Sequence, residues 1–551
     1  MTIPRYPDLV PSSLRRAWAA EGHYPDLDLY ALFRAHRCAD PERTALIDRE
    51  GPLSYAQLDH RAQCLAVGLA ETGVRPGDVV GIQLPNGRDA VTAELALAAL
   101  GAVALPFPVG RGGREALSLL GRSGARAVIA VIEYRGVPHA RELAGLADEL
   151  PDLRNVIAAG PGPVPTGCLP MAELLDADTS SSFTPTRPDP DTAARILVSS
   201  GSETEPKMVA YSHNALAGGR GNSLAPLLRD GTPPRSLFLV PLASAFGSSG
   251  TAVTLARHGG TLVLLDHFSP DAALTAIRRH RPTHVLGVPT MVRMMLERLD
   301  QRDPLHGMTA LVLGGSPLDD ATRAEATRAF DCAVVNLYGS ADGVHCHWGL
   351  ADGSPADRGP GIAVGRPDPA VCEIRIDTGH GGDPSAGTGE IIARGPMTPL
   401  CYVGDPDLNS RYRTPDGWVR TGDLGTLDAD GTLRVIGRLK DIVIRGGANI
   451  SPAEVESELS SHPDIRDVMC IGVPDPLMGE RLAACVVPKA GRALTLESLC
   501  AHLDTRGLEK RKNPERLLLL ADDLPLTPAG KPDRAALRGR LVAGLVLQQA
   551  G

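Results

Sequence analysis

The sequence predicts an α/β fold: a large N-terminal domain of stacked α/β subdomains with a β-rich subdomain, followed by a small α+β C-terminal domain. Three observations predict this order. Short apolar runs alternate with helical patterns over the first two thirds of the chain, turn signals become dense after about residue 360, and a new unit begins near Gly437. A chain of 551 residues is too long for one ordinary core, so several domains or subdomains are expected.

Short apolar runs predict the strands of the first part of the chain. They are bounded by turn residues and lie at 78–84, 102–107, 125–132, 236–243, 260–266, 283–289 and 309–315. Helical patterns lie between several of them, and this alternation favours mostly parallel sheets covered by helices. The longest apolar stretch, 90–109, contains a glutamate, a glycine and two prolines. We therefore interpret it as a buried helix that runs into a strand, and not as a membrane span.

The final third of the chain predicts two further units. Short strands with dense turn signals are expected at 373–377, 387–395 and 431–438, within a β-rich subdomain over about 360–436. A mixed unit follows, with helices expected at 452–460 and 496–506 and strands at 467–473 and 481–488. We therefore place the N-terminal domain at 1–436 and the C-terminal domain at 437–551, which is a usual size for a domain.

Composition and charge exclude several classes of protein. Lysines and arginines number 56 against 65 aspartates and glutamates, which gives a net charge of −9. This balance is not that of a protein that binds nucleic acid or an anionic membrane, so we expect neither partner. The N-terminus has no apolar segment of signal-peptide length, and the ten cysteines form no CxxC pair. We therefore expect a cytoplasmic protein with reduced thiols.

The stretch SSGSETEPKMV, at 199–209, has the residue types of a phosphate-binding loop. It follows an apolar run and offers backbone N–H groups, hydroxyls and one cation, Lys207, which together suit phosphate oxygens. Glu203 and Glu205 favour the alternative, a solvated polar turn, because carboxylates repel phosphate. The stretch alone leaves both interpretations open.

Three other segments decide between them. YGSAD at 338–342, GWVRTGDLG at 417–425 and LPLTPAGKPDR at 524–534 follow the loop in a fixed order, and RVIGRLKDIVIRGG stands between the last two. In order and spacing the set resembles the adenylate-forming superfamily of acyl-CoA synthetases, peptide-synthetase adenylation domains and luciferases. The resemblance covers about residues 30–540. It implies an enzyme that uses ATP to turn a carboxylic acid into an acyl-adenylate, with release of pyrophosphate.

The resemblance also implies which residues hold ATP. These are Ser199, Ser200, Gly201, Ser202, Lys207, Gly314, Gly315, Ser316, Asn336, Tyr338, Gly339, Ser340, Asp423, Arg438 and Lys531. In this arrangement the Tyr338 ring stacks on adenine and Asp423 accepts hydrogen bonds from the ribose hydroxyls. Lys531 bridges the α-phosphate and the attacking carboxylate, a task that suits a mobile point charge.

Further roles follow from the same resemblance. Asp342 stands where the family has a glutamate that binds Mg²⁺, and its carboxylate is the kind of ligand that this hard cation prefers. The implied catalytic residues are Lys531, Asp342 and Arg438. Lys440 resembles the hinge about which the small C-terminal domain rotates as a mobile lid. The pocket for the acid is expected near Ser244, Phe246, Gly247 and Val344.

The sequence departs from the family pattern at four places. Thr204 and Met208 replace glycines of the phosphate loop, and we expect them to stiffen it. Ala341 replaces the usual threonine, which removes a hydroxyl near the α-phosphate, and the metal ligand is Asp342 instead of a glutamate. The histidine or aromatic residue common within 241–247 is absent, which widens or repolarises the acid pocket.

The resemblance leaves the acceptor and the reaction open. Coenzyme A is the expected acceptor of a small acid, and the thiol of a carrier protein is the alternative. A branch of the superfamily in secondary metabolism instead activates nitrite with ATP to diazotise an aryl amine, and the departures on the phosphate side keep this hypothesis open. A third alternative is a nucleotide-binding protein without catalysis.

The run His345–Cys346–His347 brings two imidazoles and a thiol together in the sequence. A transition-metal site requires three or four converging ligands, and the sequence offers no matching second cluster. Because the run directly follows the nucleotide motif, we expect these side chains to pack beside the acid pocket.

Overall fold

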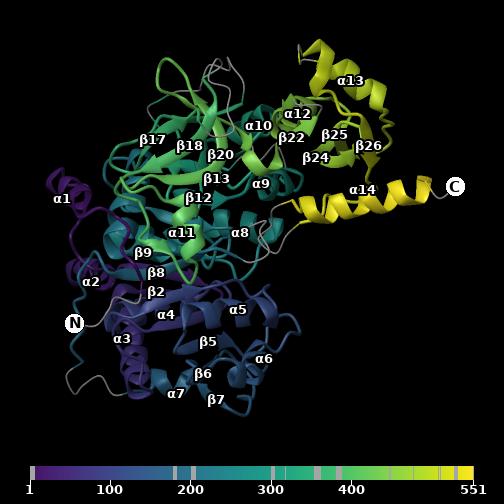
Figure 1. The fold of residues 1–551 in the computed structure, drawn as a ribbon. Helices are drawn as coiled ribbons and strands as arrows, with labels where there is room; N and C mark the ends of the chain where they lie inside the picture. Colours follow the sequence, from purple (N-terminus) through teal and green to yellow (C-terminus); the bar gives the residue numbers. More distant parts are fainter. Residues whose placement is uncertain are drawn as a thin grey trace.

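Two mostly parallel sheets of eight strands each form the larger part of the molecule (Figure 1). The structure is a computed structural model. It describes residues 6–177, 183–199, 206–299, 305–316, 318–350, 352, 361–379, 387–445, 448–475, 477–506, 508, 510–526 and 532–549. The predicted architecture, a large α/β part followed by a small α+β unit, is confirmed.

One sheet has the strand order β19-β9-β8-β4-β3-β5-β6-β7. Its strands are β3 (Val79–Gln83), β4 (Val103–Pro106), β5 (Ala127–Val131), β6 (Asn155–Ala159), β7 (Cys168–Pro170), β8 (Ala193–Val198), β9 (Met208–Ser212) and β19 (Cys401–Tyr402). The strands from β8 to β7 are parallel, whereas β9 is antiparallel to β8 and to β19. The hairpin of β8 and β9 therefore encloses the predicted phosphate loop.

The other large sheet has the strand order β15-β14-β13-β12-β10-β11-β1-β2. Its strands are β1 (Thr44–Asp48), β2 (Gly51–Ser54), β10 (Arg235–Phe238), β11 (Thr261–Leu264), β12 (His284–Gly287), β13 (Ala310–Gly314), β14 (Ala333–Gly339) and β15 (His345–Cys346). All neighbours are parallel except the two edge pairs, β1 with β2 and β14 with β15. Every apolar run of the first part of the sequence is therefore a parallel strand, as predicted.

Helix α4 (Arg88–Leu100) forms the centre of the core between the two large sheets. Its residues 90–100 are all buried, and the apolar ones share one hydrophobic cluster with side chains of β3, β4, β10 and β11. This helix and β4 are the buried helix and strand predicted from the apolar stretch 90–109. The other helices of this part are α1 (Ser12–Ala20), α2 (Leu29–Ala39), α3 (Tyr55–Glu71), α5 (Gly113–Ser123), α6 (His139–Gly145), α7 (Met171–Leu175), α8 (Pro270–His280), α9 (Pro289–Leu296), α10 (Asp320–Phe330) and α11 (Pro406–Tyr412), with short turns η1 (Ala147–Glu149) and η3 (Ala225–Leu227).

Two π-helices, η2 (Ala215–Arg220) and η4 (Gly250–Arg257), pack against each other beside this core. The glycines of η2 allow very close packing: a Cβ built on Gly219 would lie 2.2 Å from the backbone nitrogen of Met397. π-Helical segments are rare and often occur at functional sites. The sequence patterns did not predict these two elements.

The β-rich unit is an antiparallel sheet of five strands with the order β16-β21-β20-β18-β17. Its strands are β16 (Ile362–Gly365), β17 (Glu373–Asp377), β18 (Gly389–Arg394), β20 (Val419–Leu427) and β21 (Leu433–Arg438). The three strands predicted for this unit correspond to β17, β18 and β21.

The proposed boundary at 436 and 437 lies within β21, and the short turn η6 (Leu439–Asp441) and a second five-stranded sheet follow this strand. The strands and helices of this C-terminal unit are β22 (Val443–Arg445), β23 (Ala448–Ile450), α12 (Pro452–Ser460), β24 (Ile465–Asp475), β25 (Gly479–Pro488), α13 (Leu496–Thr505), η7 (Lys510–Lys512), β26 (Arg516–Leu519) and α14 (Arg534–Gln549). In Figure 1 this unit lies beside α9 and α10. An ion pair of 3.7 Å between Arg293 of α9 and Asp467 of β24 links it to the larger part.

All ten cysteines lie within the described residues and are free thiols. Seven are buried, Cys168 and Cys500 are partly exposed, and only Cys38 on α2 is exposed. Among the described residues, no helix is both long and apolar enough to cross a membrane.

Candidate active site

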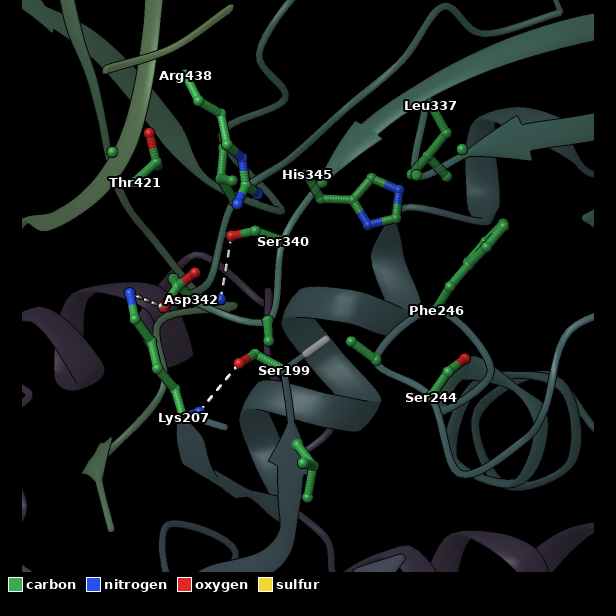
Figure 2. Close-up of a pocket in the computed structure, with 18 of the residues that line it drawn as sticks. Ser199, Lys207, Ser244, Phe246, Leu337, Ser340, Asp342, His345, Thr421 and Arg438 are labelled. Atoms are coloured by element: carbon green, nitrogen blue, oxygen red, sulfur yellow. Dashed lines mark hydrogen bonds and ion pairs between the residues drawn. The ribbon is translucent and has the colours of Figure 1, made fainter. Parts of the chain in front are cut away.

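A cavity of about 670 Å³ lies where the carboxyl ends of strands from both large sheets meet the β-rich sheet. Val198 ends β8 and is followed by Ser199, Gly314 ends β13 and is followed by Gly315, and the end of β14 and the turn after it contribute residues up to Asp342. In open parallel sheets, ligands bind at the carboxyl ends of the strands. The geometry therefore favours this cavity as the active site, and Figure 2 shows part of its wall.

The two ends of the predicted phosphate loop are held together at one edge of this cavity. The Ser199 amide donates to the Lys207 carbonyl oxygen at 2.9 Å, and the Lys207 amide donates to Ser199 Oγ at 3.1 Å. Arg111 donates to the Ser199 carbonyl oxygen at 3.0 Å, and both Ser199 and Lys207 line the cavity. The loop residues Ser200, Gly201 and Ser202, together with Thr204, lie outside the described residues.

Met208 does not belong to the loop. It is the first residue of β9, pairs with Val198 across the hairpin and is buried in a hydrophobic cluster. The expectation that Met208 stiffens the loop is therefore wrong for this residue, because a strand already fixes its backbone.

Lys207 and Asp342 face each other across the cavity wall (Figure 2). Lys207 Nζ lies 3.9 Å from Asp342 Oδ1 and 3.8 Å from the centre of the Tyr412 ring, so the cation has a carboxylate and an aromatic face as neighbours. The Tyr402 hydroxyl donates to the same Asp342 oxygen at 2.8 Å. Burial, and then the Asp342 carboxylate, raise the pKa of Tyr402, so this hydroxyl keeps its proton and orients the carboxylate.

A second carboxylate, Asp423 of β20, is shared by Tyr338 and Arg438. The Tyr338 hydroxyl donates to Asp423 Oδ2 at 2.7 Å, and Arg438 Nε lies 3.1 Å from Oδ1. Asp423 is only 5% exposed, and this burial raises its pKa, whereas the Arg438 charge lowers it. Both carboxylate oxygens therefore already have partners, which hold this carboxylate in one orientation beside the cavity.

The structure brings some of the sequence-predicted residues into the cavity wall and leaves others behind it. The wall contains Ser199, Lys207, Ser244, Phe246, Gly314, Gly315, Gly339, Ser340, Asp342, Val344, Arg438 and Lys440. The described residues that do not line it are Gly247, Ser316, Asn336, Tyr338 and Asp423. Tyr338 and Asp423 lie behind the wall: the Tyr338 hydroxyl donates to Asp423, and Asp423 pairs with Arg438, which lines the cavity. Lys531 lies outside the described residues.

On the side of the predicted acid pocket, Ser244 closes a tight turn. Its hydroxyl donates to the Pro241 carbonyl oxygen at 2.7 Å and accepts from the Gly247 amide at 2.9 Å. A Cβ on Gly247 would lie 1.9 Å from that carbonyl oxygen, so the turn requires glycine. Ser244 and Phe246 therefore shape the pocket, and Gly247 supports the turn behind them.

The residues of the His345–Cys346–His347 run point to different surroundings. His345 lines the cavity, whereas Cys346 is buried in a hydrophobic cluster next to the cavity. The two imidazole rings meet edge to face with centres 5.5 Å apart. In the described part of the chain, no group of three or more histidines, cysteines or carboxylates is placed to hold a metal ion.

Sequence reasoning missed several charged residues of the cavity wall. These are Arg111, Arg220, Glu390, Arg411 and Arg420. One of them, Arg420, stands within GWVRTGDLG but was given no role, and the others lie outside the motifs that assigned site residues. For Arg220 one signal was present: a single arginine within the otherwise small and apolar run ALAGGRG at 215–221. An isolated charge in such a run is buried only with a partner or a function.

Comparisons with known proteins agree with this geometry. Residues 33–403 match the family "AMP-binding enzyme", and residues 454–531 match its C-terminal domain. The chain is 31% identical over 540 residues to 2-hydroxy-7-methoxy-5-methyl-1-naphthoate–CoA ligase of Streptomyces carzinostaticus, with 96% of each chain covered. It is 32% identical over 554 residues to salicyl-AMP ligase / salicyl-S-ArCP synthetase of Mycobacterium tuberculosis, covering 96% of this chain and 93% of that protein.

A solved structure shows the same fold. ATP-bound MatB of Rhodopseudomonas palustris superposes with a TM-score of 0.80 at 27% identity, covering 93% of this chain and 99% of that one. The likeness therefore extends over both parts of the molecule.

Proposed function

The chain belongs to the family of AMP-binding enzymes, and from this premise we propose that it converts a small carboxylic acid into an acyl-adenylate and passes the acyl group to coenzyme A. That it is an ATP-dependent, AMP-forming ligase of carboxylic acids follows from the family and its relatives. One observation supports the assignment of the site: Lys207, Asp342 and Arg438, from distant parts of the chain, line one cavity.

In the proposed first step, the carboxylate of the acid attacks the α-phosphorus of ATP and pyrophosphate leaves. Negative charge spreads over the phosphate oxygens in the transition state, so fixed cations and N–H donors stabilise it. Lys207, held at the end of β8 and β9, supplies one such cation for the outgoing phosphates. Arg438, fixed by Asp423, supplies a second on the ribose side. Lys531 is proposed to complete the set from the C-terminal unit.

The residues present fit a magnesium ion at Asp342. This carboxylate lines the cavity within reach of the phosphate loop, and Mg²⁺ usually binds one or two carboxylates while keeping waters and substrate phosphate oxygens. When bound, the ion would neutralise charge on the leaving pyrophosphate. Tyr402 would hold the Asp342 carboxylate in position for it.

Coenzyme A is the acceptor we propose for the second step, and the first curated relative above is a CoA ligase. The second relative carries the name of a carrier-protein synthetase, so the thiol of a carrier protein is the alternative acceptor. In both cases a thiol attacks the acyl carbonyl and AMP leaves.

The test is an exchange of labelled pyrophosphate into ATP with the purified chain, Mg²⁺ and a broad panel of carboxylic acids. Exchange that depends on an acid, followed by a CoA thioester in the mass spectrum, supports the proposal. Acid-dependent exchange without a thioester would overturn the choice of acceptor. Turnover only with nitrite and an aryl amine would support the diazotising alternative. ATP binding without exchange under any of these conditions would contradict an enzymatic role.

The same assay tests the role of Lys531. We expect Lys531→Ala to reduce acid-dependent exchange by at least about 100-fold, because a cation at the reacting oxygens acts mainly in the transition state. The Kd for ATP, measured by calorimetry, is expected to change by less than about tenfold. An unchanged exchange rate would remove Lys531 from the mechanism.

A further inference from the structure

Arg220 differs from the other arginines of the cavity wall, because it is buried and, among the described residues, no carboxylate pairs with it. Arg438 pairs with Asp423, Arg420 with Glu390 and Arg111 with Glu115. Arg411 has no carboxylate partner in the described part of the chain, but it is exposed to water. Arg220 is only 4% exposed, and among the described residues its Nε and Nη2 have no hydrogen-bond partner.

The remaining guanidinium nitrogen of Arg220 shows where the side chain is anchored. Nη1 donates to the Ala245 carbonyl oxygen at 2.8 Å, which places the group next to the turn formed by Ser244 and Phe246. The guanidinium carbon also lies 5.5 Å from the centre of the Tyr211 ring, but one neutral carbonyl and one aromatic face carry no negative charge to balance a buried cation. A buried cation without an anion costs several kcal/mol, so its retention indicates a partner that arrives with a ligand.

The surroundings of Arg220 make this region more positive still. The nearby Arg195 is also buried, and its own charge is paired with Glu94 at 2.7 Å. Burial lowers the pKa of Arg195, and the Arg220 charge lowers it further, as expected of two neighbouring cations. Because Glu94 pairs with Arg195 and Glu390 pairs with Arg420, neither carboxylate neutralises Arg220, and its positive charge attracts anions.

His345 offers a second donor in the same region. It is 7% exposed, lines the cavity, and its Nε2 has no hydrogen-bond partner among the described residues. Burial holds the pKa of His345 well below 6.5, and electrostatic repulsion from the neighbouring His347 and Arg220 lowers it further. The imidazole is therefore neutral at pH 7, and its Nε2–H tautomer can donate one hydrogen bond to an oxygen without adding charge.

The place of this pair relative to the phosphate side indicates which part of a substrate it meets. In Figure 2, Lys207, Asp342 and Ser199 lie on one side, whereas His345 lies on the other side with Leu337, Phe246 and Ser244. The carboxylate that reacts must lie near the phosphate side. A group that reaches His345 and Arg220 is therefore at the far end of the acid.

From these contacts we propose that the acid activated by this enzyme carries a second anionic oxygen group, a carboxylate in the simplest case, which pairs with Arg220 and accepts a hydrogen bond from His345. The apolar residues around the pair, among them Val288 and Leu337, would hold the carbon skeleton between the two ends. This inference rests on the proposed function, because it assumes that an acid occupies this side of the cavity.

The experiment compares each diacid with the ester that masks one of its carboxylates. Succinic acid and monomethyl succinate form one pair, and isophthalic acid and its monomethyl ester form the other. Acid-dependent pyrophosphate exchange with the full chain gives kcat/KM for each. We expect at least one diacid to exceed its ester by about 100-fold, because the ester leaves the buried cation unpaired. Arg220→Gln should lower kcat/KM for the diacid by about the same factor, mainly through KM, and so bring the diacid close to its ester.

Variants separate recognition from folding. Arg220→Lys keeps the charge and should retain part of the preference for the diacid. His345→Leu removes the donor and should reduce this preference by about tenfold, whereas His345→Asn keeps a donor and should reduce it less. Arg257→Gln is the matched control, since Arg257 lies on the neighbouring η4 and does not line the cavity. If Arg220→Gln does not fold, as judged by its melting curve, the His345 variants carry the test.

The outcomes distinguish two failures. Esters or monoacids that are activated as well as the diacids, or a preference that survives Arg220→Gln, would overturn this inference and leave the proposed function intact. Absence of exchange with every acid would overturn the proposed function, and this inference with it.

Discussion

Asp423 fixes the side of the candidate site that we propose for the ribose. Its two oxygens hold Tyr338 and Arg438, so the carboxylate both orients an aromatic ring and fixes a cation of the cavity wall. Removing the charge would leave the Arg438 guanidinium, which is directed into the cavity, without its anion. The loss of a buried carboxylate from such a pair costs more than the loss of a neutral hydrogen bond.

We therefore predict that Asp423→Asn raises the KM for ATP by about 10- to 100-fold. Tyr338→Phe is the matched comparison, because it removes only the hydroxyl that donates to Asp423 and keeps the ring. Its effect is expected to stay below about tenfold. Steady-state pyrophosphate exchange at varied ATP concentration measures both values. Equal effects of the two substitutions would show that the carboxylate acts only through the tyrosine.

The same residues show what sequence could reveal about the site. Lys207, Asp342 and Arg438 belong to motifs, and a motif preserves the spacing that brings them to the cavity. Arg220 could not be identified in this way, because its burial depends on a π-helix and on close packing against Met397, which no local pattern encodes. Met208 was misassigned for a similar reason: the hairpin of β8 and β9, and not the loop motif, decides its backbone.

At the scale of elements, the π-helix η2, which packs against η4, positions one side of the cavity through Arg220. Gly219 of η2 lies against the backbone of Pro396 and Met397, and Met397 lines the cavity. A side chain at this glycine has no room, because the nearest atoms are backbone atoms that cannot rotate away. The glycine thus sets the distance between η2 and the segment after β18.

We predict that Gly219→Ala lowers the melting temperature by about 5 °C, since overpacking against backbone costs a few kcal/mol. Acid-dependent exchange should fall with it, because Met397 is displaced. Gly145→Ala at the end of α6 is the control, since a Cβ there meets no atom within 4 Å. Differential scanning fluorimetry measures both variants. A melting temperature equal to that of the control would show that the two segments can move apart at little cost.

The parallel strands were predictable because their apolar runs are continuous and buried on both faces, as in β3, β5 and β13. The short edge strands β2, β15 and β19 were not predictable, because a strand of two to four residues is too short to show an alternation of apolar and polar residues. These edge strands are fixed by their partners in the sheet and not by their own sequence.

At the scale of the whole molecule, buried histidines couple stability to pH. His213 is 1% exposed, its Nδ1 accepts from the Leu29 amide at 3.1 Å, and burial lowers its pKa to about 4. Below pH 6.5 the unfolded chain therefore binds a proton at this residue that the folded chain does not. Stability contributed by the neutral imidazole is present at pH 7 and is lost as the pH falls from about 6.5 towards 4.

We predict a loss of up to about 3 kcal/mol from His213 over this range, which follows from a shift of about 2.5 pH units. Urea midpoints measured between pH 7.5 and 5 should decrease for the natural chain and decrease less steeply for His213→Gln. His306→Gln, at a side chain that is 66% exposed, is the control and should keep the natural slope. An identical slope for His213→Gln would assign the pH dependence to other groups.

The division of the molecule at residues 436 and 437 remains a proposal, and so does the rotation of the C-terminal unit about Lys440. Two contacts described at the junction bear on it. The Ser451 hydroxyl donates to the Ile436 carbonyl oxygen at 2.6 Å, and Arg293 pairs with Asp467 at 3.7 Å. A rotation would have to break the second contact, which is long and therefore weak. Lys440 itself lies in η6 at the cavity wall, between the two units.

The distribution of thiols gives a direct way to observe such a rotation. Burial raises the pKa of Cys332, Cys372, Cys401 and Cys485 to about 12, so these thiols are protonated and shielded from alkylating reagents. Cys38, the single exposed thiol, is carried by α2 in the larger part of the molecule. A maleimide dye would therefore attach there first without prior mutagenesis. A second fluorophore on the C-terminal unit would then report, by energy transfer, each change in the distance between the two parts during turnover.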